Sequence, residues 1–283
     1  MLEAPRRFYL CPPDHFQIRY AINAWMDVNN PVDPARASEQ WQSLYETYRR
    51  LGADVQVLDP EPGVSEFTFP GDSIFLFVDT AVSSRFRHPE RDPEVAPMAR
   101  RFASRGYTVH PLPEGLHLEG NAEAIYWHGQ LFGGHGVRSD RAALLHLGTL
   151  LDIEVHTFEI REPYFHFDVT FFPIDKSLAA YNPAAFNADG MRLLERLCPD
   201  LIPVDEAEAR VLACNGISLN NTVVVSTPLA RRFIEAVRAR GKEVVALDLS
   251  EFRKAGGGAK CLTLEAYEYQ RHIVAPGSSP TPP

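Results

Sequence analysis

One local pattern recurs five times along this chain and constrains its fold more than any other feature. Each copy contains the end of a helix, a small or polar turn and a short apolar strand. Successive copies begin about 42 to 54 residues apart, at 51–60, 105–113, 151–159, 198–206 and 240–248. A regular period of this length predicts one supersecondary unit that is repeated in a line or a ring.

Hydrophobic periodicity predicts the remainder of each unit. Amphipathic helices are expected at 35–51, 93–105, 140–151 and 228–240. Further apolar strands are expected within 73–84, 123–134, 166–175 and 220–226. Each unit therefore runs strand, strand, helix, strand, and Gly52, Gly106 and Gly241 stand where glycine often ends a helix. An ordinary layered βαβ domain also alternates helices with strands and remains the alternative architecture.

A ladder of polar residues follows the same period. Its members are separated by 49, 47, 47, 49 and 46 residues and are Asn23, Asp72, Glu119, His166, Asn215 and Cys261. In a five-unit ring, positions at one repeat phase point toward a common axis. Asn23 and Cys261, near the two ends of the chain, would then meet in the unit that closes the ring. The ladder therefore predicts a central polar site.

Cys261 follows three glycines, Gly256 to Gly258, in the segment AGGGAKC. Glycine lets the backbone approach a ligand closely, so this turn suits a nucleophile that is pressed against a planar substrate. A thiolate is a strong nucleophile, and a cationic substrate such as a guanidinium lowers the pKa of the thiol in the site. A buried structural cysteine after a flexible turn is the alternative interpretation.

Four other residues, in the ladder or next to it, are candidates for an acid, a base and carboxylate ligands. His166 is a candidate general acid and base, and Asp168 would face the same side of an extended strand. Asp72 and Glu119 each precede an apolar strand. Together the three carboxylates would pair with a buried guanidinium, or one of them would orient His166. Taken singly, His166 is better explained as a core histidine, and Asp72 and Glu119 as turn residues.

Three arginines are candidates for binding a substrate carboxylate. Arg85 and Arg87 share one face of an extended segment, and Arg138 lies in the segment GGHGVRSD. Solvated surface arginines are the alternative for at least one of them.

The composition argues against nucleic-acid and membrane partners. The formal net charge is −9 and no block of Lys or Arg stands out. No apolar run reaches the roughly 18 residues that span a bilayer. No long apolar stretch follows the N-terminal arginines, so we expect no signal peptide.

The four cysteines are far apart, which favours reduced thiols in a cytoplasm over disulfides or a zinc site. Residues 276–283 are rich in Pro and Ser and are expected to form a disordered tail.

Eight short segments carry a resemblance to a known family. They are INAWMD (22–27), FPGD (69–72), SRFRHPER (84–91), LEGN (118–121), GVRSD (136–140), FHFD (165–168), CNGISLNN (214–221) and GGGAKCLTLE (256–265). In these segments the chain resembles the guanidino-group-modifying (pentein) superfamily. That group includes arginine deiminase, dimethylarginine dimethylaminohydrolase, arginine dihydrolases and amidinotransferases.

The resemblance implies a fold and a set of roles. The fold is an α/β five-bladed pseudo-symmetric propeller, expected here as a single catalytic domain over 1–275. Cys261 would be the nucleophile, His166 the general acid and base, and Glu119 its orienting partner or a guanidinium ligand. The resemblance further implies these substrate-binding residues: Asp72 and Asp168 at the guanidinium, and Arg85, Arg138 and Arg87 at the α-carboxylate. Asn23, the ladder residue of the closing unit, is also expected to bind substrate. Neither a metal nor an organic cofactor is implied.

Two departures from the family pattern affect the choice of reaction. Relatives often carry Asp, Glu or Asn where this chain has Gly71, and arginine dihydrolases use an Asn near there for a second hydrolysis. Asn121 and Ala122 follow the Glu-Gly pair where relatives often have a second acid. The chain-wide likeness is to bacterial sequences of the dimethylarginine dimethylaminohydrolase type.

The function expected from the residues and the resemblance is hydrolysis of arginine or an N-methylated arginine, with a ureido product such as citrulline. The expected partner is a small guanidino substrate, and the sequence leaves a homodimer or higher homo-oligomer open. Amidino transfer and arginine dihydrolysis are the enzymatic alternatives. A non-catalytic binding propeller is the alternative from another class.

Overall fold

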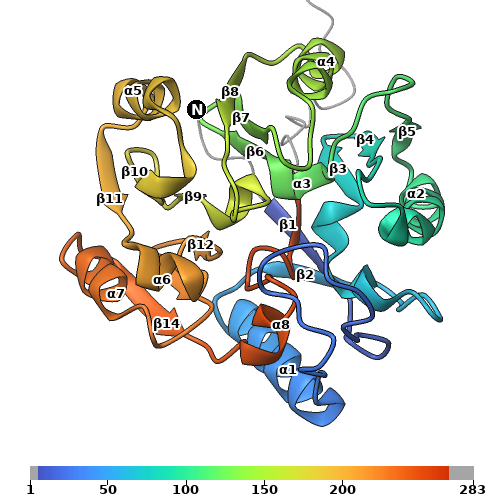
Figure 1. The fold of residues 1–283 in the computed structure, drawn as a ribbon, viewed down its shortest axis with the longest axis horizontal. Helices are drawn as coiled ribbons and strands as arrows, with labels where there is room; N and C mark the ends of the chain where they lie inside the picture. The colour runs from blue at the N-terminus through green and yellow to red at the C-terminus, as the bar shows by residue number, and fades with distance from the viewer. Residues whose placement is uncertain (1–5, 268–283) are drawn as a thin grey trace, which may run out of the picture.

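The computed structural model describes residues 6–267, and the tail expected at 276–283 lies outside the described residues. The fold is mixed α/β, with the strand groups arranged around the centre and the longer helices on the outside (Figure 1). Within the described residues no helix is long and apolar enough to cross a membrane.

Five groups of three strands share one pairing pattern. In each group the first strand is antiparallel to the second, and the second is parallel to the third. The groups are β3 (Ile74–Phe77), β4 (Thr80–Ser83), β5 (Thr108–His110); β6 (Ala124–Trp127), β7 (Gln130–His135), β8 (Val155–Glu159); β9 (Phe171–Pro173), β10 (Leu178–Tyr181), β11 (Asp200–Pro203); β12 (Ile217–Leu219), β13 (Thr222–Val225), β14 (Glu243–Ala246); and β15 (Leu264–Tyr267), β1 (Arg6–Leu10), β2 (Asp54–Val57).

The last group joins the two ends of the described chain. Strand β15 pairs antiparallel with β1, with Phe8 opposite Glu265. It also pairs in parallel with β3, which gives a six-stranded sheet in the order β2-β1-β15-β3-β4-β5. The predicted order of strand, strand, helix, strand is thus found in four groups, and β15 completes the fifth from the C-terminal side.

A helix connects the second and third strand of each group. These helices are α1 (Pro34–Arg50), α2 (Val95–Ala103), α4 (Arg141–Leu151), α5 (Ala188–Leu197) and α7 (Arg231–Arg238). Asp33 caps α1 by accepting from the backbone N–H of Ala35, as expected for an N-cap aspartate. The three predicted end glycines have φ of +83°, +90° and +76°, so their helices end in the left-handed conformation that glycine favours.

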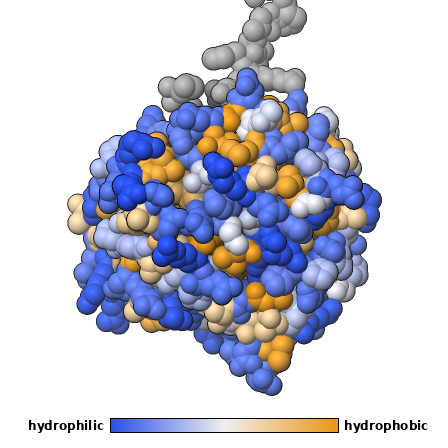
Figure 2. Space-filling view, turned by 45° about the horizontal axis from the view of Figure 1, so that its top comes forward, coloured by the Kyte–Doolittle hydropathy of each residue, from blue (hydrophilic) through white to orange (hydrophobic). Residues whose placement is uncertain are grey.

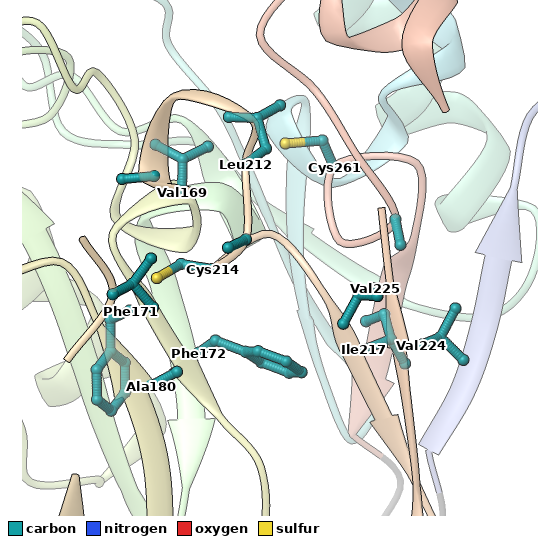
Figure 3. Packing of buried hydrophobic residues seen from close by; sticks show 14 of the residues in the cluster. Val169, Phe171, Phe172, Ala180, Leu212, Cys214, Ile217, Val224, Val225 and Cys261 are labelled. Carbon is teal, nitrogen blue, oxygen red and sulfur yellow. The ribbon is translucent and has the colours of Figure 1, made fainter. Parts of the chain in front are cut away.

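Apolar side chains from these elements form three hydrophobic clusters. The largest cluster joins α1 with the β6–β14 groups and reaches the turn that carries Cys261. Figure 3 shows Cys261, Leu212 and Val169 toward one end of the residues drawn from this cluster. The face in Figure 2 is mostly hydrophilic with scattered apolar residues.

The ladder residues occupy equivalent places in these groups. Asp72 ends the 3-10 helix η2 (Pro70–Asp72) directly before β3, and Glu119 precedes α3 (Gly120–Glu123), which leads into β6. His166 precedes η4 (Phe167–Val169), which leads into β9, and Cys261 lies between α8 (Ser250–Arg253) and β15. The remaining short helices are η1 (Ser65–Thr68), η3 (Pro89–Glu94), η5 (Pro183–Ala185) and α6 (Glu206–Arg210).

One expectation at these positions is wrong. The segment 166–175 is not a continuous strand, because β9 begins only at Phe171 and Asp168 lies in the 3-10 helix η4. Strand alternation therefore does not relate His166 to Asp168. The 3-10 turn carries Asp168 toward the Cys261 sulfur instead.

Candidate active site

The glycine run before Cys261 is required by close contacts. A Cβ at Gly256 would lie 2.8 Å from the Phe165 ring, and Gly256 has φ +83°. A Cβ at Gly257 or Gly258 would clash with Phe69 or Ser226. The turn therefore packs closely against Phe165, Phe69 and Ser226, and only glycine fits there.

The Cys261 sulfur has one amide and one carboxylate within hydrogen-bonding distance. Asn215 Nδ2 lies 3.1 Å from Sγ, and Asp168 Oδ2 lies 3.5 Å from it. Burial raises the pKa of the Cys261 thiol well above its ordinary value, and the charges of Asp168 and Asp72 raise it further. Without a bound cation, Cys261 is therefore a thiol near neutral pH.

His166 and Glu119 form a buried pair. His166 Nε2 lies 2.7 Å from Glu119 Oε2, and Arg138 Nη1 lies 3.2 Å from the same oxygen. Burial opposes the ionisation of Glu119, but the hydrogen bond and charge of His166, with Arg138, lower its pKa to about 2. Burial likewise opposes protonation of His166, but Asp72 and Glu119 raise its pKa to about 9. The pair therefore consists of a carboxylate and an imidazolium at neutral pH.

Asp72 is bound to an arginine that the sequence analysis did not single out. Arg91 Nη1 lies 2.6 Å from Asp72 Oδ2, while Arg91 Nε lies 2.7 Å from Glu94 and 3.3 Å from Glu66. Asp72 Oδ1 and Glu66 Oε1 are buried and form no hydrogen bond with the described residues. Two carboxylate oxygens are thus available to a cationic ligand.

These groups line one small cavity. The predicted site residues that line it are Asn23, Asp72, Arg138, His166 and Cys261. Asp168 and Glu119 contact the cavity residues Cys261 and His166 from behind. His166 Nδ1 is buried and has no hydrogen-bond partner among the described residues. Residues at equivalent positions of successive repeats, from all parts of the chain, thus lie together around the cavity.

Arg85 and Arg87 are not among the residues that line the cavity. The Arg85 guanidinium donates to the backbone carbonyls of the 112–116 segment. Arg87 is partly exposed and forms an ion pair with Asp140 at 2.7 Å. Arg91, from the same segment SRFRHPER, lines the cavity in their place.

Two more buried ionisable residues were not singled out from the sequence. Glu123 accepts the backbone N–H of Phe167 at 3.1 Å, and burial, partly offset by His166, raises its pKa to about 8. Lys260 Nζ lies 2.7 Å from Asn121 Oδ1 and 2.9 Å from Glu265. The sequence feature that could have pointed to Lys260 is its position next to Cys261. Among the described residues, no group of three or more His, Cys, Asp or Glu side chains is arranged to hold a metal ion.

Comparisons with known proteins agree with this arrangement. The model of the family described as "N,N dimethylarginine dimethylhydrolase, eukaryotic" matches residues 12–268. The N(G),N(G)-dimethylarginine dimethylaminohydrolase of Mycobacterium tuberculosis is 36% identical over 263 residues, which cover 93% of this chain and 86% of that protein. The bifunctional arginine dihydrolase/ornithine cyclodeaminase AgrE of Nostoc is also 36% identical over 277 residues, but this chain spans only 39% of its length.

Solved structures give the same result. The product-bound N-terminal domain of ArgZ, a cyanobacterial arginine dihydrolase, has a TM-score of 0.88 and 33% identity, covering 93% of this chain and 98% of that chain. A dimethylarginine dimethylaminohydrolase adduct has a TM-score of 0.74 at 16% identity, covers 92% of this chain and 98% of that chain, and shows the shared fold. This chain therefore belongs to the dimethylarginine dimethylaminohydrolase family of the guanidino-group-modifying superfamily.

Proposed function

We propose that this chain hydrolyses the guanidinium group of arginine or an N-methylated arginine, with Cys261 as the nucleophile. The observation that carries the proposal is the cavity itself. It places the Cys261 thiol near unpartnered carboxylate oxygens of Asp72 and Glu66 and near the His166–Glu119 pair. A buried cation requires such carboxylates, since an unpaired charge is strongly disfavoured away from water.

The guanidinium would bind between Asp72 and Asp168. Asp168 lies against the sulfur, so a guanidinium paired with it would present its carbon to Cys261. Burial raises the pKa of Asp168 to about 6, partly offset by His166 and Lys260, so it is mostly ionised at neutral pH. A bound cation would offset the carboxylates that keep Cys261 protonated. The thiol would then lose its proton to solvent as the substrate binds, because His166 is already protonated, and Cys261 would become a thiolate.

His166 would then act as acid and as base. Protonated at neutral pH, it would give a proton to the departing ammonia or methylamine and afterwards take one from the water that releases the ureido product. Glu119 would keep the imidazole oriented throughout and would favour its protonated form before each turnover.

At the amino-acid end, we propose Arg138 as the partner of a substrate carboxylate. Arg138 is buried in the cavity wall over the Phe165 ring, and its Nη2 donates to the carbonyl of Ile22. Arg85 and Arg87 would support neighbouring loops, because their guanidinium groups are engaged with the 112–116 carbonyls and Asp140. Asn23 would hold the loop that covers this end, since it donates to Ala255 O and accepts from Trp25 N.

Arginine dihydrolysis, with ornithine and ammonia as products, is the second candidate, favoured by the likeness to ArgZ and AgrE. Gly71 favours a single hydrolysis, because arginine dihydrolases use an Asn near this position for the second one. A Cβ at this position would have ordinary contacts with Asn121 and Thr263 at 3.5 Å, so the space beside it accommodates a small side chain that this chain lacks.

We also propose that the strand groups close into a five-bladed α/β propeller formed as one catalytic domain over 1–275. Support comes from the fivefold repetition of one pairing pattern, from the pairing of β15 with both β1 and β3, and from the circular arrangement in Figure 1.

Product analysis tests the reaction. The purified chain is incubated separately with arginine, mono- and dimethylarginine and agmatine, and products are identified by mass spectrometry. Citrulline with ammonia or a methylamine is expected from an arginine-type substrate. Ornithine with more than one equivalent of ammonia would establish the second candidate, and unchanged substrates throughout would refute both.

A further inference from the structure

The side-chain amide of Asn215 links the two segments that meet at the nucleophile. Its Oδ1 accepts the backbone N–H groups of Gly258 at 2.8 Å and Cys261 at 3.2 Å. Its Nδ2 lies 3.2 Å from the carbonyl of Asp168 and 3.1 Å from Cys261 Sγ. Asn215 is fully buried, so water does not compete for these contacts.

The partners determine which end of the amide faces the sulfur. Two backbone N–H groups can only donate, so the atom that meets them must be the amide oxygen. The carbonyl of Asp168 can only accept, so the atom that meets it must be the NH₂ group. An N–H donor is therefore aimed at Sγ by the hydrogen bonds on both sides of it.

The backbone of Asn215 is fixed in the same way. Ser226 Oγ donates to the Asn215 carbonyl at 2.6 Å and accepts the N–H of Ala259 at 2.8 Å. The amide is thus in place before any charge forms on the sulfur. A donor that is already oriented stabilises a developing anion without reorganisation.

The surroundings of the sulfur explain why such a donor is needed. The Asp168 carboxylate lies 3.5 and 3.8 Å from the sulfur, and its charge repels a thiolate. Among the described side chains, Asn215 is the hydrogen-bond donor to Sγ. We propose that Asn215 is a catalytic residue that donates a hydrogen bond to the Cys261 thiolate and stabilises it beside Asp168. This inference rests on the proposed function, in which Cys261 is the nucleophile.

Alkylation of Cys261 by iodoacetamide, without substrate, measures thiolate formation directly. The full chain, Asn215→Ala and Asn215→Asp are compared from about pH 6 to about pH 10, and modification of the Cys261 peptide is followed by mass spectrometry. Asn215→Ala removes the side-chain donor without adding charge. Alkylation should therefore slow about tenfold across this range, where Cys261 is mostly a thiol, and this corresponds to a rise of about one unit in the pKa of the thiol. Asn215→Asp keeps an acceptor for the Gly258 and Cys261 N–H groups but adds a charge, so its shift should be larger.

Asn182→Asp is the matched control. Asn182 is also buried and its Oδ1 also accepts a backbone N–H, that of Ala184, but its side chain does not touch the sulfur. Its alkylation profile should equal that of the unchanged chain. Turnover gives a second readout, because loss of the donor should lower kcat more than it raises KM.

A folded Asn215→Ala protein with the unchanged pH profile would overturn the inference. If that variant does not fold, Asn215→Asp decides, and an unchanged profile there overturns the inference as well. Failure of the proposed function looks different: the unchanged chain would then turn over none of the guanidino substrates, or Cys261→Ser would keep its turnover, whatever the Asn215 variants do.

Discussion

His166 Nε2 and Glu119 Oε2 lie 2.7 Å apart, and both side chains are almost completely buried. The two pKa values move in opposite directions, to about 9 for His166 and about 2 for Glu119. Because the folded pKa of His166 is raised, the stability from its protonation is fully present below its ordinary value of 6.5 and is lost as pH rises through 9. The stability from ionised Glu119 is present above its ordinary value of 4.5 and is lost as pH falls through 2.

Glu119→Gln should lower the pKa of His166 and weaken catalysis. Glutamine removes the charge that keeps the imidazole protonated, so the alkaline limb of the kcat profile should move to lower pH. At about pH 8, kcat should fall roughly 10- to 100-fold. Glu154→Gln is the control, because Glu154 faces His156 at 3.8 Å on the surface. An unshifted alkaline limb in Glu119→Gln would show that His166 is not the acid.

Glu123→Gln should flatten the dependence of stability on pH. Burial raises the pKa of Glu123 from 4.5 to about 8. The folded state therefore holds a proton that the unfolded state has lost, and stability falls as pH rises through this window. Replacing it with Gln should remove a slope of up to about 1.4 kcal/mol per pH unit, measured by urea unfolding. Glu195→Gln, at an exposed position, should leave the slope unchanged. Equal slopes in Glu123→Gln and the unchanged chain would count against this account.

Arg138→Lys should raise KM and also lower kcat. The guanidinium contacts both oxygens of Glu119 and lines the cavity, and an ammonium cannot reproduce its planar set of donors. We expect KM for an arginine-type substrate to rise about tenfold or more. Arg87→Lys, on the exposed pair with Asp140, should change KM by less than about twofold. The reverse ranking in steady-state kinetics would assign the carboxylate to Arg87.

Gly134→Ala should destabilise the fold. A Cβ there would lie 2.6 Å from Phe167 Cβ and 2.8 Å from Glu123 Oε2. Overpacking of this kind costs about 1–3 kcal/mol, which urea unfolding resolves. At Gly71 the new Cβ would lie at ordinary contact distances, the nearest being 3.5 Å, so Gly71→Ala should stay within about 0.5 kcal/mol. Similar losses in both variants would mean that the contacts around Gly134 can relax.

The repeat made much of this site predictable from sequence. Asp72, Glu119, His166 and Cys261 are separated by whole repeats because each precedes the first strand of its group. Equivalent positions in a repeated unit point to the same place, so a period in sequence becomes a cluster in space. Locally, however, η4 replaced the expected strand at Asp168, since three residues of 3-10 helix leave no periodic signal.

The choice among the arginines could not be predicted. Arg85, Arg87 and Arg91 lie within seven residues of each other, and only Arg91 lines the cavity. The 3-10 helix Pro89–Glu94 turns it toward Asp72 and Glu66, which come from an earlier part of the chain. Such a contact depends on tertiary packing, and neither residue type nor spacing encodes it. Glu123 was missed because its importance comes from burial beside His166 and from the Phe167 N–H.

The central claim is that the Cys261 sulfur forms a covalent bond with the guanidinium carbon. Rapid acid quenching during turnover, followed by mass spectrometry of the Cys261 peptide, tests it most directly. The account predicts an amidino-type adduct on Cys261 that appears with substrate, decays as product forms and is absent in Cys261→Ser, which should have no measurable turnover. Full turnover by Cys261→Ser, or an adduct on Cys11, Cys198 or Cys214 instead, would contradict it.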